Sequence, residues 1–346
     1  DAIPESSLSL DERVNYEIYR DQIDTLISQQ KFREYEKPFN SDSSFWSGFN
    51  YTAMRTLHDA KEYRAYIAQM NDIPRYFAEY TVNMRAGLKR GFTPPKATLV
   101  GREVSVSATV DAKDAESTLL WKPSKSMPAS IPATEQAVLK AEAKAAIEGK
   151  VKPAYATLLA FLRDDYIPHT TETLAAESLP DGPAYYRAQI REFSTLDMAP
   201  EDIHQLGLKE VAKIHAQMLD VMKETGFQGD FPAFLAYLRS DPKFYAKTPE
   251  ELLMRGAWIA KRVDGKLSAY FGWLPRSRFA IEPVPADMAP FYTSARGGKS
   301  VYLLNTYDLP SRPLYNLTAL TLHESAPGHS LQGGLAEEQT GLPDFR

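Results

Sequence analysis

Three residues near the C-terminal end of the chain have the types and the approximate spacing of a zinc hydrolase site. They lie in the segment TLHESAPGHSLQ, residues 321–332, which contains His323, Glu324 and His329. The chain has only six His, and two of them are concentrated here. Neutral imidazoles hold zinc, and a nearby carboxylate takes a proton from the water that the metal activates. The segment therefore predicts a metal centre, with Glu324 as the general base.

The spacing of the two His is unusual for such a site. They are six residues apart, whereas the helical motif H-E-x-x-H places them four residues apart. On a straight helix, six residues rotate by about 600°, which leaves the imidazoles roughly 120° apart. Pro327 and Gly328 permit a break or bulge between them, because Pro disrupts the preceding turn and Gly tolerates unusual dihedrals. A second interpretation is that a helix simply ends at Ala326 and His329 starts the next segment.

The composition is that of a globular protein and excludes several classes of function. Apolar residues make up 43% of the chain, which is enough for a substantial core. The formal charge of −5 argues against a nucleic-acid-binding protein, which usually carries a basic excess. No apolar run reaches the ~20 residues of a membrane-spanning helix. The absence of Cys excludes disulfides, thiolate zinc ligands and a Cys nucleophile.

The first 265 residues are predicted to be a mainly helical region. Helix-favouring composition, with Pro or Gly at the ends, predicts helices over 51–70, 75–90, 133–150, 153–166, 200–225 and 249–262. The helix over 200–225 has the clearest pattern, because its apolar residues recur at helical spacing and Gly226 follows as a cap. The alternation over 104–110 indicates a strand or an extended segment, and the Pro- and Ser-rich stretch 122–132 indicates a loop.

The character of the sequence changes after Gly265. Between Tyr270 and Tyr307 the chain is rich in Pro and Gly and contains short apolar runs such as 301–304, which indicates a small sheet of a few strands. The helix that carries His323 is expected to begin between 311 and 314. We therefore expect a mainly α protein with a small β-sheet preceding the motif helix. Residues 1–265 would form the helical region, and 266–346 the sheet and the motif helix.

Several motifs, taken in their order along the chain, resemble those of the bacterial domain of unknown function 885 (DUF885) family. TLHESAPGHSLQ resembles its H-E-x-x-P-G-H-x-x-Q signature, and GPAYY at 182–186 is similar to its Gly-x-x-Tyr-Tyr segment. EDIHQLGL at 201–208 resembles its helix opening, and NTYD at 305–308 its strand before the motif. The resemblance covers roughly 87–346. Several ordered motifs are more specific than the His-Glu pair alone.

The family in turn resembles the gluzincin-type zinc metallopeptidases, such as the carboxypeptidase Taq group. This resemblance implies a large helical, gluzincin-like fold, a Zn²⁺ ion held by His323 and His329, and Glu324 as the base. Gluzincins take a third ligand, usually a Glu, from a later helix. Glu337 and Glu338 would lie about 12 Å along a helix from His329, so we expect the third ligand beyond residue 346, in a C-terminal remainder of the same protein. A cleaved or shortened chain of this kind would have little activity by itself.

Five further residues are candidates for contact with a peptide substrate. In gluzincins the strand before the motif hydrogen-bonds an extended substrate, which implies this role for Tyr302 and Asn305. Tyr292 and Arg296, followed by two Gly, form a polar segment suited to an oxyanion or a terminal carboxylate. Gln332 lies one turn after His329 and is placed to orient it. The other His, at 58, 169, 204 and 215, have no partner at ligand spacing.

The function that these residues predict is a zinc-dependent peptidase that cleaves small peptides. The same chemistry would serve other acyl bonds, such as amides and esters. The alternative from another class is a non-catalytic helical protein that binds a peptide or ligand with a degenerate metal site. No G-x-S-x-G elbow and no phosphate loop is present, which disfavours a serine hydrolase and a nucleotide enzyme. A start at Asp1 fits a mature periplasmic or secreted protein, with or without a lipid anchor before processing. It equally fits a chain that was shortened in another way.

Overall fold

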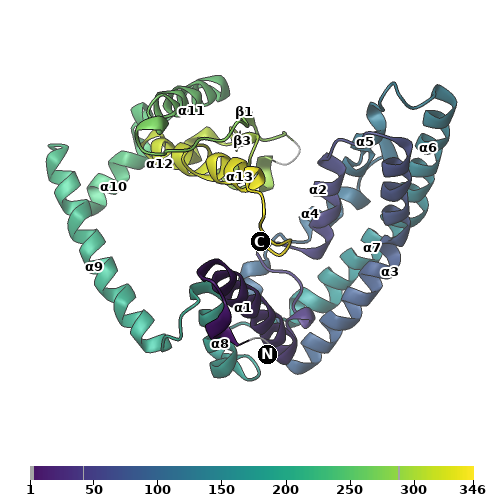
Figure 1. Cartoon of the computed structure of the whole chain (residues 1–346), viewed down its shortest axis with the longest axis horizontal. Helices are drawn as coiled ribbons and strands as arrows, with labels where there is room; N and C mark the ends of the chain where they lie inside the picture. The colour runs from purple at the N-terminus through teal and green to yellow at the C-terminus, as the bar shows by residue number, and fades with distance from the viewer. Residues whose placement is uncertain (1–3, 42, 287–288) are drawn as a thin grey trace. The chain divides into compact units, whose positions relative to one another are not determined.

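The computed structural model describes residues 4–41, 43–286 and 289–346. Helices account for 67% of the chain and strands for 4%, in one small sheet (Figure 1). This confirms the prediction of a mainly α protein with a small sheet. The chain divides into two compact units, Asp1–Leu206 and Gly207–Arg346.

The first unit is helical throughout its regular structure. Its α-helices are α1 (Leu10–Phe32), α2 (Gly48–Met54), α3 (Ala60–Arg90), α4 (Val104–Val110), α5 (Lys122–Lys125), α6 (Ala133–Ala146), α7 (Lys152–Ala160) and α8 (Gly182–Ser194). A π-helical segment, Ile147–Val151, joins α6 to α7, and a second one, Phe161–Tyr166, follows α7.

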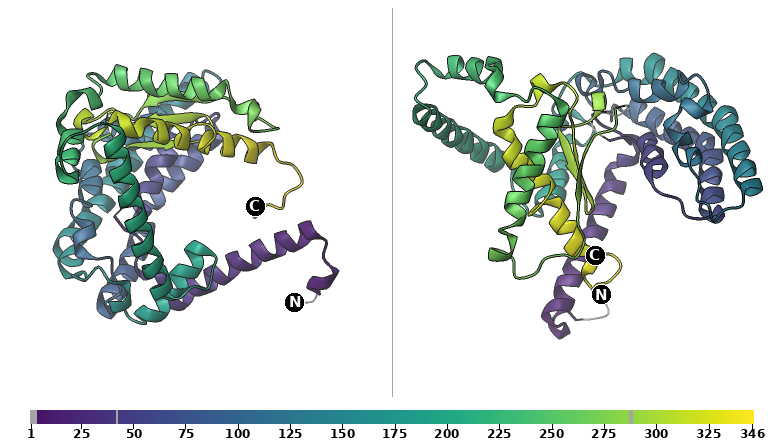
Figure 2. Two further views of the ribbon diagram at one scale, coloured as in Figure 1. Left: turned by 90° about the vertical axis from the view of Figure 1, so that its left-hand side faces the viewer. Right: turned by 90° about the horizontal axis from the view of Figure 1, so that it is seen from above.

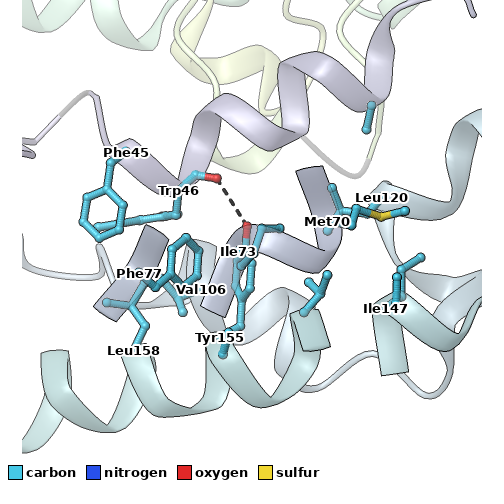
Figure 3. Packing of buried hydrophobic residues seen from close by; sticks show 14 of the residues in the cluster. Phe45, Trp46, Met70, Ile73, Phe77, Val106, Leu120, Ile147, Tyr155 and Leu158 are labelled. Carbon is cyan, nitrogen blue, oxygen red and sulfur yellow. Dashed lines mark hydrogen bonds between the residues drawn. The ribbon is translucent and has the colours of Figure 1, made fainter. Parts of the chain in front are cut away.

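The core of the first unit lies between α3 and the run from α6 to α7 (Figure 3). Phe77 of α3 packs against Tyr155 of α7, with ring centroids 4.9 Å apart. The Tyr155 hydroxyl donates a hydrogen bond of 3.2 Å to the carbonyl of Trp46, which is itself fully buried. A buried Tyr is stable only where its hydroxyl has such a partner, so this contact fixes the segment before α2 on the helical core.

The predicted break at Pro74 is wrong, because α3 continues through it. Pro74 removes one backbone hydrogen bond from the helix. Ile73 and Phe77 beside it are buried in the core, and this packing outweighs the lost bond. The prediction that Gly91 ends the helix is confirmed, since Gly91 adopts the left-handed conformation with φ 76°.

Other local predictions also differ from the structure: the helix expected over 51–70 is interrupted between α2 and α3, and the loop expected over 122–132 begins with α5. The helices expected over 133–150 and 153–166 form one continuous run, because the wider π turns before Lys152 accommodate the Pro that follows it. The segment 104–110 is the helix α4 and not a strand. The adjacent residues Val106 and Ser107 of this segment are both buried. In a strand with one buried face, only one of two adjacent side chains would be buried.

The second unit contains the sheet and the motif segment. Its elements are the larger part of α9 (Pro200–Glu224), then α10 (Phe231–Ser240), α11 (Pro249–Asp264), β1 (Ala280–Pro283), β2 (Ala295–Gly297), β3 (Val301–Leu304), α12 (Leu314–Glu324) and α13 (His329–Glu338). The strand order is β1-β3-β2, with β1 parallel and β2 antiparallel to β3. All three strands lie within 270–307, as predicted.

Helices α11 and α12 lie beside the sheet (Figure 2). Gly256 of α11 faces β3, since a Cβ at this position would lie 3.3 Å from the Leu304 side chain. Tyr302 and Leu304 of β3 are buried there, together with Leu317 of α12. Because α11 packs on the sheet, the change in composition at Gly265 falls inside the second unit and does not separate the two units.

Helix α9 confirms its prediction as an element, since it spans Pro200–Glu224 and Gly226 follows with φ 72°. It buries no residue, and six of its large apolar side chains are 47–66% exposed. The hydrophobic periodicity thus predicted the helix correctly but says nothing about what covers its apolar face. In the described part of the chain, no helix has both the length and the apolar character needed to cross a bilayer.

Candidate metal centre

The motif residues are positioned by the end of one helix, a short break and the start of the next. In α12, Leu317, Thr321 and Glu324 are buried along one face, which holds the helix against the sheet. The helix ends at Glu324, and α13 begins at His329. The expected irregularity between Ser325 and Gly328 is therefore present.

The break brings the two imidazoles together despite their spacing. The ring centroids of His323 and His329 are 4.9 Å apart, with the ring planes at 89°. Gly328 makes this return possible, because a Cβ there would lie 1.8 Å from the carbonyl oxygen of His323. Its N–H donates to the Leu322 carbonyl at 3.0 Å, which closes the turn. A straight helix would have left the rings on different faces.

Glu324 lies between these rings and the sheet. Its residue is only 8% exposed, whereas both His are exposed. Its Oε2 accepts the backbone N–H of Gly297 at 2.6 Å and lies 3.9 Å from Nε2 of His329. A Cβ at Gly297 would lie 1.9 Å from the Glu324 carbonyl oxygen, so β2 passes directly against the end of α12. The carboxylate is thus held in one place by a strand backbone.

The donor atoms fit a zinc ion. One nitrogen from each His and one carboxylate oxygen of Glu324 lie within 4.8 Å of one another. Two ligand atoms of a tetrahedral zinc site, with bonds of 2.0–2.1 Å, are about 3.3 Å apart. Because the imidazoles are exposed, small rotations of the two His side chains can bring the donor atoms from 4.8 Å to this spacing. Two imidazole nitrogens with a free carboxylate beside them supply two ligands and the general base of a catalytic zinc site.

Tyr302 and Asn305 are placed differently from the prediction. Tyr302 is fully buried, its hydroxyl lies 3.3 Å from Thr321 Oγ1, and burial raises its pKa to about 12. The buried Asn305 amide donates to the carbonyls of Ala289, Tyr292 and Thr293 at 2.9–3.2 Å. Both side chains are occupied within the core. Neither side chain is therefore free to contact a substrate.

The strand beside the motif is also not the one predicted. β3, which directly precedes α12 in the sequence, is the central strand of the sheet. β2 is an edge strand, as is β1, and it is β2 that meets Glu324. The order of strands in space cannot be read from their order in the sequence when the connections do not force adjacent pairing.

Tyr292 and Arg296 lie together, with the guanidinium 5.5 Å from the centre of the Tyr ring. Successive residues of a strand point to opposite faces. Gly297 faces Glu324, so the Arg296 side chain leaves from the other face of β2. Gln332 is exposed on α13, one turn after His329. The structure thus brings His323, Glu324 and His329 together but does not bring Arg296 into the cluster.

The two acidic residues rejected as ligands are engaged elsewhere. Glu337 forms an ion pair with Lys299. Glu338 accepts the backbone N–H of Arg276 at 2.6 Å. Neither belongs to the cluster of donor atoms around His323.

Two positioning groups escaped the sequence analysis. One is the N–H of Gly297, and the other is Ser330, whose hydroxyl donates to the Gly298 carbonyl at 2.8 Å. Ser330 also donates its N–H to the Ser325 carbonyl at 2.8 Å, so it ties the start of α13 to the end of β2. A Ser beside His329 and a pair of Gly at a strand end carry no distinctive pattern, so the sequence offered no signal for either.

Comparisons with known proteins agree with the motif. Residues 1–346 match the family described as "Bacterial protein of unknown function (DUF885)". The fold is similar to that of the putative lipoprotein from Colwellia psychrerythraea, with a TM-score of 0.78 and 22% identity. That match covers 87% of this chain and 55% of the other, so this chain spans about half the length of its structural relative. No curated protein is significantly similar to the chain.

Proposed function

This chain belongs to the DUF885 family, and we propose that it is a zinc-dependent hydrolase that cleaves small peptides, with Glu324 as the general base. The observation that carries the proposal is the convergence of His323, Glu324 and His329. Their donor atoms lie within 4.8 Å of one another, although the sequence spacing on a regular helix would separate them.

His323 and His329 would hold the zinc ion through their imidazole nitrogens. A zinc ion held there supplies a Lewis acid that polarises the scissile carbonyl and makes water more acidic. Catalytic zinc sites usually have three protein ligands, so the proposal requires a third ligand in addition to the two His. We propose a Glu outside residues 1–346 for this ligand, as the gluzincin resemblance implies.

Glu324 has the position that a general base requires. Its carboxylate Oε2 lies next to the two imidazoles and is fixed by the Gly297 N–H. A carboxylate that accepts a proton on this oxygen remains close enough to deliver it to the nitrogen of the leaving amine. The fixed orientation lowers the cost of reaching the reactive geometry.

The edge of β2 supports a peptide as the substrate. Ser294 and Gly298 direct backbone groups toward β3, since Asn305 donates to the Ser294 carbonyl and Gly298 donates to the Val301 carbonyl. Alternation then directs the backbone groups of Ala295 and the carbonyl of Gly297 away from β3, whereas the Gly297 N–H already donates to Glu324. An extended peptide would pair with this edge by adding a strand to the sheet. This role replaces the one predicted for β3.

A location outside the cytoplasm is part of the proposal. The structural relative in Colwellia psychrerythraea is described as a putative lipoprotein. We propose a periplasmic or secreted protein, with a lipid anchor before processing as the finer alternative.

The experiment that tests the function compares Glu324→Gln with wild type in the full-length gene product. The amide keeps the shape of the carboxylate but accepts no proton, so we expect hydrolysis of short peptides to fall by about 10²–10⁴-fold or more. Zinc content, measured by mass spectrometry of the metal, should remain. Glu337→Gln on α13 is the matched control and should retain both activity and zinc.

The same assay separates the alternatives. Near-normal peptide turnover by Glu324→Gln would show that the base is assigned wrongly. Zinc binding with cleavage of esters or other amides, but not of peptides, would support hydrolysis of another acyl bond. Binding of peptides without zinc and without turnover by wild type would support the non-catalytic binding protein.

A further inference from the structure

The segment 261–278 runs from the last turn of α11 almost to the start of β1 and carries several exposed basic side chains. We refer to it as the aromatic–basic segment. It contains one acidic residue and five basic ones, in a chain whose formal charge is −5. The basic residues are Lys261, Arg262, Lys266, Arg276 and Arg278. All five are exposed. This stretch is therefore a local positive surface on an acidic protein.

The pairing of these charges leaves a positive excess. Lys261 and Arg278 share one carboxylate, that of Asp264, at 2.7 and 3.2 Å. Arg276 lies 3.6 Å from Glu338. Among the described residues, neither Arg262 nor Lys266 has a carboxylate within ion-pair distance, and Arg262 instead lies 4.5 Å from the centre of the Trp258 ring. The patch can therefore attract an anionic partner.

The same segment exposes two large aromatic side chains from a fixed loop. Tyr270 is 80% exposed and Trp273 is 70% exposed. Leu267 and Phe271 pack inward against Ala326 of the motif segment and anchor the loop from inside. Tyr270 and Trp273 thus point to solvent from a loop that is fastened to the body of the unit. A partner that covers these rings would remove apolar surface from water, which is favourable.

We propose that the aromatic–basic segment docks on the surface of an anionic lipid bilayer. Tyr and Trp are the side chains that settle at the interface between headgroups and acyl chains, because each combines an apolar ring with a polar group. Lys and Arg around them are attracted to anionic headgroups. An acidic protein would satisfy the charges, but the combination of outward Trp and Tyr with an unpaired Lys and Arg favours the lipid interface. This docking is independent of the proposed hydrolysis.

The test measures binding of the protein to vesicles of phosphatidylcholine with and without about 30% phosphatidylglycerol. Wild type should co-sediment with the anionic vesicles much more than with the neutral ones, and salt should weaken the binding. Trp273→Ala and Lys266→Glu should each lower the partition coefficient about tenfold. The fluorescence of wild type should shift to the blue on binding, and this shift should be absent in Trp273→Ala.

Two controls match these variants on other elements. Phe193→Ala removes an aromatic side chain that is 82% exposed on α8, and Lys223→Glu reverses an exposed charge on α9. Both should bind vesicles like wild type, and circular dichroism should confirm that all variants are folded. Absence of binding to anionic vesicles, equal binding to neutral ones, or variants that bind like wild type would each overturn the proposal. An acidic protein would then be the partner to consider.

Discussion

Glu324 and Gly297 form a close contact in the candidate site, and each depends on the other. The strand places an N–H within 2.6 Å of the carboxylate and its own Cα directly against the backbone of the helix end. Only a residue without a side chain permits this approach. The position of the proposed base is therefore set by a glycine that carries no chemistry of its own.

Substitution of Gly297 by Ala should strongly destabilise the second unit. The new Cβ would lie 1.9 Å from the Glu324 carbonyl oxygen and 2.6 Å from its carbonyl carbon, so the strand or the helix must shift. We expect a loss of about 2–4 kcal/mol in the free energy of unfolding, measured by urea denaturation.

Gly298→Ala is the control for this substitution, one residue further along. Its Cβ would meet nothing closer than the Val301 carbonyl oxygen at 3.7 Å, which is an ordinary contact. We expect a loss below about 1 kcal/mol. Equal losses for the two variants would contradict the importance of the contact between β2 and α12.

At the scale of elements, a polar cluster joins the end of α1 to α8. Lys37 donates to the Tyr185 hydroxyl at 3.0 Å, and burial lowers the pKa of its ammonium group. Glu34 accepts the Gln189 amide at 2.8 Å. Burial, followed by repulsion from Glu192, raises the pKa of Glu34 above its usual value of 4.5. The cluster holds two elements that are more than 140 residues apart in the sequence.

The raised pKa of Glu34 predicts a pH dependence of stability. The folded state binds the Glu34 proton more tightly than the unfolded state, so this stabilisation is complete below pH 4.5 and is lost as the pH rises through the folded-state pKa. Glu34→Gln keeps the acceptor for Gln189 and removes the buried charge. We expect it to be more stable than wild type at pH 7 and nearly equal to it at about pH 4.

Thermal unfolding at the two pH values checks this prediction. Glu17→Gln, an exposed position on α1, serves as the control and should differ little from wild type at either pH. A Glu34→Gln protein that is less stable than wild type at pH 7 would mean that the attraction between Glu34 and Lys37 outweighs the cost of burial.

The helices and strands also show which features of the fold the sequence could predict. Local signals predicted what depends on neighbouring residues: α9, the cap at Gly91 and the break between Glu324 and His329. They failed where tertiary packing decided, as at Pro74, which sits inside a helix held by buried neighbours. They also failed to predict that β2, and not β3, lies at the sheet edge beside the motif. Strand order depends on contacts between segments that are distant in the sequence.

On the scale of the whole molecule, the candidate site lies entirely within the second unit. His323, Glu324, His329 and the strand that holds them all belong to Gly207–Arg346. The first unit has its own core around Trp46 and Tyr155. Composition predicted the mainly α class, because it depends on averages over the chain. It could not place the division of the units, which falls within α9 and is set by contacts.

The most direct test of the proposed metal centre is the zinc content of the full-length gene product after dialysis against zinc. We expect about one zinc per chain in wild type and in His58→Ala, whose imidazole is exposed on the first unit. His323→Ala and His329→Ala should each lose the metal and keep the fold. A wild-type protein without zinc, or zinc retained by the double variant of His323 and His329, would contradict the proposed metal centre.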